Sequence, residues 1–290
     1  MTSSSALPER AGRHCHNALN PFHSAHYFAP ELAAELAGLG VPEGRAGYFA
    51  TRSAAMGAVG PGTVAATFFS FKPALIAEHL PQVWTVTTPA AVLDARLRAV
   101  DASLRRQLGD AVVESPEMAE AAGLALRAAE GCTPHARPLY SAHADLPVPD
   151  APHLAYWHAA SLLREHRGDG HLMTLLDAEL DPVEALVTHA ASGRGMSYRG
   201  ILATRGWTPE ELTAAQERLR VRGLLAAENE LTEAGVALRK DLERATDRLD
   251  RAPYERLGAT DVARLTELAG GFTARLMEAG AFPQQLFSDE

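Results

Sequence analysis

The chain has 290 residues, of which 47% are hydrophobic and 22% are charged, and this composition is typical of a globular protein rather than a disordered one. The formal net charge of -9 and the lack of a basic segment argue against nucleic-acid binding, so DNA is not expected as a partner. The apolar runs are too short to span a membrane, residues 1–19 contain no apolar signal segment, and Cys15 and Cys132 are too few for a disulfide framework, so we expect a cytoplasmic protein with free thiols.

The composition also predicts the fold class. Alanine and leucine are abundant while aromatic residues make up only 6%, which favours helices over sheets. The length suits two domains of ordinary size. We therefore expect a mainly α protein with a helical N-terminal domain, residues 1–150, and a C-terminal domain, residues 151–290, that contains a winged helix-turn-helix-like core at 181–250.

The first helical stretch, residues 9–28, is rich in histidine. His23 and His26 share a helical face, and Tyr27 lies on the same polar stripe as His23. Two histidines three residues apart can chelate a metal, although no third ligand stands at a readable spacing and no Cys-x-x-Cys accompanies them. Three interpretations stay open: metal ligands, hydrogen-bonding residues of a pocket, or ordinary core and surface histidines.

Helix start signals mark the chain up to residue 130. Thr88-Pro89 opens a helix that ends at Gly109, and Ser115-Pro116 opens another to about Glu130. Upstream lies a glycine-rich segment that lacks the Gly-Lys-Ser/Thr ending of a phosphate loop. Arg52 lies a few residues before this segment, and we expect its side chain to reach the functional site.

Residues 131–153 are rich in proline and histidine and are predicted to form one long loop. Ordered loops of that length are often functional. His143 and Asp145 are therefore candidates for a pocket wall, with exposed loop residues as the alternative.

The stretch from 162 to 171 is the strongest candidate for the functional site. Gly168 and Gly170 are expected to break the helix there, so that charged side chains lie at the junction of two buried helices. Burying charges is costly unless each one finds a partner. The alternative is a structural corner in which these charges bind backbone groups. The charged and titratable residues of the stretch are Arg164, Glu165, His166, Arg167, Asp169 and His171.

Roles can be assigned to these side chains if the site is catalytic. His166 or His171, oriented by Glu165 or Asp169, would form the acid–base pair, because imidazole titrates near neutrality. Arginine side chains suit the binding of an anionic group. Arg164 and Arg167 would hold that group of the substrate.

The remainder of the chain has the order of a winged helix-turn-helix. Capping boxes at Asp181 and Thr208 open two of its helices, and Gly223 closes the second. The expected elements are helices 183–192, 197–205, 209–222 and 233–249, with a short hairpin formed by 224–226 and 230–232. The last helix could pair with a second copy in a homodimer or pack within its own chain.

Two sets of residues carry a resemblance to known families. The segments Ile201-Leu202-Ala203, Gly206-Trp207, Arg222-Gly223-Leu224-Leu225 and Leu231-Thr232-Glu233-Ala234-Gly235 resemble the winged-helix core of MarR-type regulators. The stretch from His23 to Glu31 and the block from Arg164 to His171 resemble the actinobacterial SalK-like family. This resemblance implies a helix-turn-helix-derived fold and, for most members, no assigned activity.

We therefore expect a small-molecule-binding protein, with an enzyme of specialised metabolism as the further option. Its pocket would be lined by His23, His26, Tyr27, Arg52 and residues 164–171. DNA binding would be lost, because the recognition helix mixes glutamates with its arginines and the wing is acidic. The alternatives are a ligand-responsive transcriptional regulator of MarR type and a haem- or metal-binding protein; the sequence does not identify a cofactor.

Overall fold

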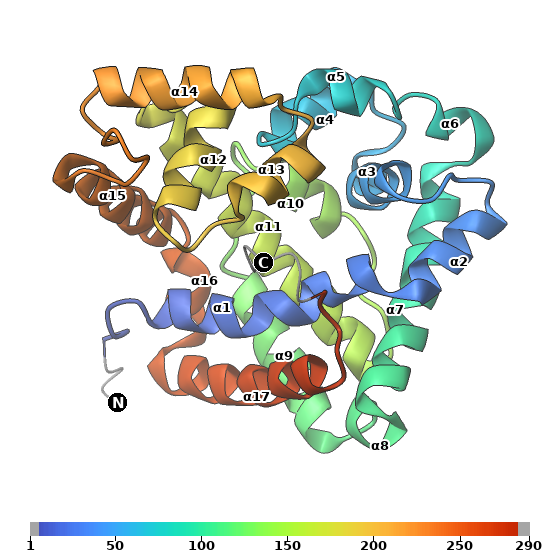
Figure 1. The fold of residues 1–290 in the computed structure, drawn as a ribbon. Helices are drawn as coiled ribbons and strands as arrows, with labels where there is room; N and C mark the ends of the chain where they lie inside the picture. The colour runs from blue at the N-terminus through green and yellow to red at the C-terminus, as the bar shows by residue number, and fades with distance from the viewer. Residues whose placement is uncertain (1–5, 284–290) are drawn as a thin grey trace.

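The regular structure of this chain is helical (Figure 1), in a computed structural model that describes residues 6–283. Within that range, extended segments pair only at an isolated antiparallel bridge between Leu225 and Leu231. The fold is therefore mainly α, as expected. No helix in the described range has the length and apolar character needed to cross a membrane.

The first half of the chain comprises α1 (Ala11–Ser24), η1 (Ala25–Phe28), α2 (Pro30–Gly38), α3 (Arg45–Ser53), η2 (Ala54–Met56), α4 (Pro61–Phe68), α5 (Pro73–Ala77), α6 (Val83–Val86), α7 (Pro89–Leu108), α8 (Asp110–Val113), α9 (Pro116–Ala129) and α10 (Pro138–Ala144). The second half comprises α11 (Pro152–Asp177), α12 (Pro182–Ala191), α13 (Tyr198–Arg205), α14 (Pro209–Val221), α15 (Glu233–Leu249), α16 (Arg251–Leu257) and α17 (Ala259–Glu278).

The central element is α11, which packs against α1, α7, α9, α10 and α15 (Figure 1). The expected helix break at Gly168 and Gly170 is wrong, because both glycines lie inside this one continuous helix of 26 residues. An interior glycine costs a helix only about 1 kcal/mol relative to alanine, which the burial of α11 on several sides outweighs. Gly170 has a packing reason of its own: a Cβ there would lie 2.7 Å from Nη1 of Arg137. The glycine thus makes room for the Arg137 guanidinium, which donates to the backbone oxygens of His166 and Leu249.

Part of the expected long loop at 131–153 is also helical. Residues 138–144 form α10, with Pro138 at its first position. The Asp169 Oδ2 atom accepts hydrogen bonds from the backbone N–H groups of Leu139 (3.0 Å) and Tyr140 (2.9 Å). A carboxylate from α11 therefore caps the start of α10, which local sequence could not reveal.

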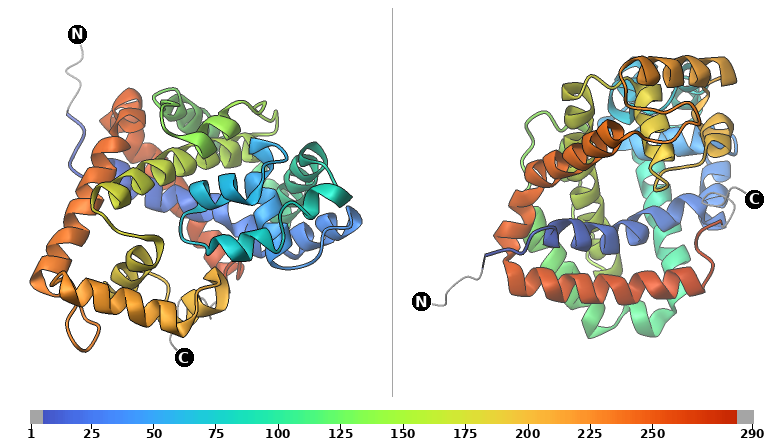
Figure 2. Two further views of the ribbon diagram at one scale, coloured as in Figure 1. Left: turned by 90° about the horizontal axis from the view of Figure 1, so that it is seen from above. Right: turned by 60° about the vertical axis from the view of Figure 1, so that its left-hand side comes forward.

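Three apolar cores hold the helices together. The largest combines residues of α1, α7, α11 and α17, such as Leu19, Val100, Tyr156 and Leu265. Figure 2 shows α1 and α17 side by side, from opposite ends of the chain. This core contains residues from both sides of position 150, and the domain boundary expected there stays a prediction.

A separate core belongs to the winged helix-turn-helix, α12 to α15. Leu212 and Leu219 of α14 pack there with Ile201 of α13 and Leu242 of α15. Both expected capping boxes, at Asp181 and Thr208, are present. The expected hairpin is reduced to the single bridge named above, so the wing is short.

Candidate functional site

A cleft of about 480 Å³ lies between the end of α4, α11, α12 and the loop that follows α12. We call it the α11 cleft. Its charged and titratable lining residues are Arg52, Arg164, Glu165, Asp169, His171, His189, Arg194, Arg205 and Arg239. Its apolar lining includes Phe68, Phe69, Leu172, Leu175, Leu186 and Met196.

The charges of the α11 cleft are unbalanced. Five arginines face two carboxylates, in a chain whose formal net charge is -9. A hollow lined by one sign of charge between low-dielectric walls concentrates ligands of the opposite sign. The cleft is therefore suited to an anion whose body is apolar.

An ion-pair cluster forms one wall of the cleft. The buried Glu165 Oε2 atom lies 3.3 Å from Nη2 of Arg52 and also accepts a hydrogen bond from Arg164. Burial works against ionisation of Glu165, but Arg164 and Arg52 outweigh it and hold the pKa of this carboxyl well below its usual value. Glu165 is thus a structural counter-ion at neutral pH rather than a proton donor.

Two polar atoms of this cluster have no partner. Glu165 Oε1 and Arg52 Nε are buried without a hydrogen bond in the described chain. Leaving such an atom unpaired costs on the order of 1–3 kcal/mol. A bound molecule in the cleft could satisfy them.

The expected histidines of α1 and η1 lie outside this lining. His23 Nδ1 lies 2.7 Å from Ser161 Oγ, whose hydroxyl donates to the Trp157 carbonyl, so His23 donates through Nδ1. His26 Nδ1 donates to the carbonyl oxygen of His23 at 2.6 Å. The Tyr27 ring contacts the His26 ring in a tilted arrangement, with ring centroids 4.0 Å apart. The buried His23 and His26 and the half-buried Tyr27 thus form a cluster beside α11 instead of lining the cleft.

Both histidines are neutral at pH 7. Burial lowers the pKa of His26 to about 3, with help from Arg96, and burial also lowers the pKa of His23 well below its usual value. Each ring therefore presents a lone pair at Nε2, and both Nε2 atoms are buried without a partner in the described chain. Between residues 6 and 283, however, no group of three or more His, Cys, Asp or Glu side chains is arranged to hold a metal ion.

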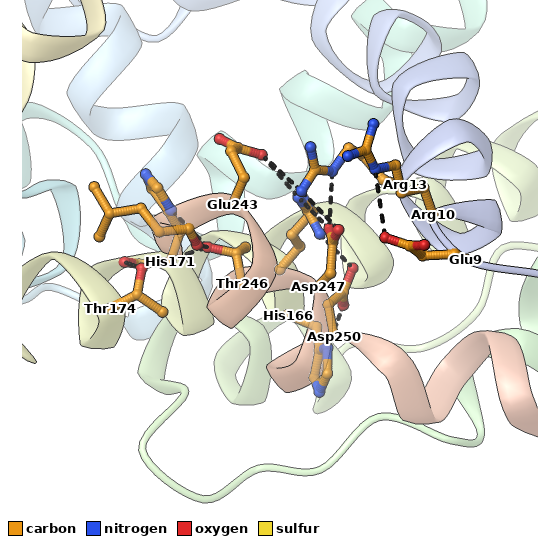
Figure 3. A network of polar contacts seen from close by, with 12 residues as sticks. Glu9, Arg10, Arg13, His166, His171, Thr174, Glu243, Thr246, Asp247 and Asp250 are labelled. Atoms are coloured by element: carbon orange, nitrogen blue, oxygen red, sulfur yellow. Dashed lines mark hydrogen bonds and ion pairs between the residues drawn. The ribbon is translucent and has the colours of Figure 1, made fainter. Parts of the chain in front are cut away.

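His166 faces the end of α15 rather than the cleft (Figure 3). Arg167 also pairs with α15 and does not line the cleft. His166 Nδ1 lies 2.8 Å from Asp250 Oδ1, and Arg167 pairs with Asp247 at 3.0 Å and Asp250 at 3.5 Å. Arg167 does not line the cleft and these carboxylates engage its guanidinium, so its expected role as an anion-binding residue stays a prediction.

Neither Glu165 nor Asp169 orients His166 or His171 in the structure, where these rings bond to Asp250 and Thr246 instead. His171 does line the cleft, but its Nδ1 lies 2.9 Å from Thr246 Oγ1, whose hydroxyl donates to the Leu242 carbonyl (Figure 3). Asp169 is engaged with α10, and Glu165 with two arginines. Burial, followed by Arg239, lowers the pKa of His171 to about 4. This ring is therefore a neutral hydrogen-bond acceptor at pH 7.

Four charged or titratable residues of the cleft were missed from the sequence: His189, Arg194, Arg205 and Arg239. One signal was present for Arg239. It shares the buried face of α15 with Gly235, Leu242 and Thr246, and a charged residue in an apolar helical stripe points to a buried partner or a ligand. No comparable pattern marks Arg194 or Arg205, which reach the cleft from a loop and a helix end.

One family model matches this chain in the comparison with known proteins. No curated protein and no solved structure matches this sequence. A model of a helix-turn-helix family matches residues 12–283, which is nearly the whole chain. The chain therefore belongs to this helix-turn-helix family.

Proposed function

We propose that the protein binds a small organic anion, a carboxylate with an apolar body, in the α11 cleft. The observation that carries this proposal is the lining of the cleft, in which five arginines face two carboxylates beside a wall of phenylalanine, leucine and methionine side chains. Ligand pockets commonly combine an apolar lining with a few polar groups that fix orientation. The buried Nε–H group of Arg52, which has no acceptor in the described chain, supports the same assignment.

Arg52 and Arg164 have different roles in ligand binding. Arg52 is held against Glu165 and stacks over Phe68 at 4.3 Å, so its geometry is fixed before a ligand arrives. The Arg164 side chain is 28% exposed and bonds Glu165 through one nitrogen, which leaves donors for a ligand carboxylate. Arg164 is therefore the residue we assign to the ligand's charge.

Binding is better supported than catalysis. His171 is the only one of the histidines proposed as acid–base catalysts from the sequence that lines the cleft in the described structure. A general base works best with a pKa near the operating pH, whereas the pKa of His171 is lowered to about 4. We assign His171 to accepting a hydrogen bond from the ligand, and turnover by an enzyme of specialised metabolism, as the SalK-like resemblance suggests, remains an extension of this proposal.

We further propose that the winged helix serves as a scaffold and does not bind DNA. DNA-binding helices need arginine and lysine side chains available for phosphates and bases. Here Arg218 pairs with Asp181 and Glu184, and Arg222 pairs with Glu184 and donates to the carbonyls of residues 178 and 179. Arg220 is bonded to Glu217 and Asn229. A MarR-type regulator would instead show salt-dependent, sequence-selective duplex binding in a gel-shift assay, and such binding would contradict this scaffold role.

The binding proposal is tested by calorimetry and thermal shift with matched ligand pairs. Phenylacetate and octanoate are compared with phenylacetamide and octanamide, which have the same apolar bodies without the charge. We expect the carboxylates to bind and raise the melting temperature, and the amides to bind at least about tenfold more weakly, since a hydrogen bond to a charged group contributes on the order of 1.5–3 kcal/mol. Equal behaviour of acid and amide would contradict the proposal.

A further inference from the structure

A second hollow adjoins the α11 cleft. It has a volume of about 560 Å³ and lies between the start of α1, the loop after α12 and α15. We call it the α15 groove. His189, Arg194 and Arg239 line both hollows, so these residues form a shared wall.

The α15 groove is more strongly cationic than the cleft is. Six arginine and lysine side chains line it, against Glu230 and Glu243. Three of them have a carboxylate partner within the protein: Arg13 pairs with Asp247 at 2.6 Å, Arg244 with Asp241 at 2.7 Å and Arg10 with Glu9 at 3.9 Å. The remaining cations face the hollow with little compensation.

Arg194, Arg239 and Lys240 carry most of that uncompensated charge. In the described chain, neither Arg194 nor Lys240 forms an ion pair, and the nearest carboxylate oxygen to Arg239 is Glu243 Oε1 at 3.8 Å. Arg239 is only 8% exposed, and burial, together with the charge of Arg194, lowers its pKa. Like charges held together in this way are unfavourable unless an anion bridges them.

We propose that the ligand is a phosphorylated organic acid, whose phosphate lies in the α15 groove while its carboxylate and apolar body occupy the α11 cleft. This inference rests on the function proposed above. A phosphate carries up to two charges and three acceptor oxygens, so it can pair with several arginine and lysine donors at once. Arg194 and Arg239, on the shared wall, contact both halves of the ligand.

The test uses inorganic pyrophosphate and phenylacetate as separate calorimetric probes of the two hollows. Lys240 lines the groove alone, so Lys240→Gln is expected to weaken pyrophosphate binding about three- to tenfold and to leave phenylacetate binding unchanged. Arg164 lines only the cleft, so Arg164→Gln should weaken phenylacetate binding and leave pyrophosphate binding unchanged. Arg194→Gln should weaken both probes, because Arg194 lines both hollows.

The control is Arg248→Gln, which removes the same charge from an exposed position on α15 outside both hollows. If Arg248→Gln weakens pyrophosphate as much as Lys240→Gln does, binding is non-specific and the proposal is overturned. The proposal is also overturned if the wild-type protein does not bind pyrophosphate, or if a DNA duplex displaces bound pyrophosphate in a way that depends on Lys240. Pyrophosphate binding that needs Lys240, in a protein that binds no carboxylate, would uphold the groove as a phosphate site and contradict only the function proposed for the cleft.

Discussion

At the scale of single residues, the histidines of the charged block in α11 bond to side chains at the far end of α15. Residues 164–171 do carry the buried charges of α11, as expected. His166, however, pairs with Asp250, 84 positions away, and His171 with Thr246, 75 positions away. The spacing of residues along one helix does not predict which side chains of a helix much later in the sequence will contact it. The roles of individual histidines could therefore be decided only from the fold.

Asp169 gives the first prediction at this scale. Asp169→Ala leaves the N–H groups of Leu139 and Tyr140 without their acceptor, and should lower the free energy of unfolding by about 1–3 kcal/mol. Asp169→Asn keeps an acceptor oxygen and should cost much less. Urea denaturation of both variants at pH 7 measures the difference, and equal losses would contradict the capping role.

The stability difference between the wild type and Asp169→Asn should also depend on pH. Burial raises the pKa of Asp169 from 3.8 to about 6, so the folded state keeps a proton that the unfolded chain has already released. The wild type therefore loses stability from this group as the pH rises from about 4 to about 6, and an asparagine does not. Relative to the wild type, Asp169→Asn should be more stable at pH 7 than at pH 4. A pH-independent difference would show that Asp169 titrates normally.

At the scale of elements, helix starts were predictable and helix interiors were not. The caps at Thr88, Ser115, Asp181 and Thr208 accept the backbone hydrogen bonds that their sequences suggested. Gly168 and Gly170 were expected to end a helix, yet packing carries α11 through both. The capping groups act within one turn, whereas the continuity of α11 depends on neighbours distributed over the whole fold.

The two glycines of α11 should respond oppositely to alanine. A Cβ at Gly168 would meet only side-chain atoms at ordinary contact distance, the nearest at 3.5 Å, so Gly168→Ala should stabilise the helix by about 0.5–1 kcal/mol. A Cβ at Gly170 would lie 2.7 Å from Arg137 Nη1, so Gly170→Ala should destabilise the protein despite the same gain in helix propensity. Thermal unfolding of both variants measures whether each substitution raises or lowers the melting temperature.

Gly123, in α9, is the matched control for these two variants. A Cβ at this position would meet nothing within 4 Å, so Gly123→Ala should show the propensity gain alone. Two stabilising substitutions in α11 would mean that Arg137 does not depend on the space at Gly170.

At the scale of the whole molecule, buried histidines should make the protein sensitive to acid. Burial lowers the pKa values of His16, His23, His26, His143, His158 and His171. In the unfolded chain these rings take up protons below about pH 6.5, whereas in the folded state they stay neutral to about pH 4 or below. Stability is therefore fully present above about pH 6.5 and is lost as the pH falls.

We expect the free energy of unfolding to fall by at least about 3 kcal/mol between pH 7 and pH 5, because one such histidine contributes up to about 1.4 kcal/mol per pH unit. Urea titrations at pH 7, 6 and 5 measure this loss. His158→Gln should reduce it, since burial lowers the pKa of His158 to about 4, and His135→Asn, at an exposed position, should not. An unchanged stability at pH 5 would refute the assignment of these rings as buried and neutral.

The central claim, an organic anion bound in the α11 cleft, is tested most directly by a crystal structure of the protein with 4-bromophenylacetate, read by the anomalous signal of bromine. The account predicts bromine against the apolar wall near Phe68, Leu172 and Leu175, with the carboxylate within hydrogen-bonding distance of Arg164. Bromine at another site, or an empty cleft in crystals soaked at saturating concentration, would contradict it.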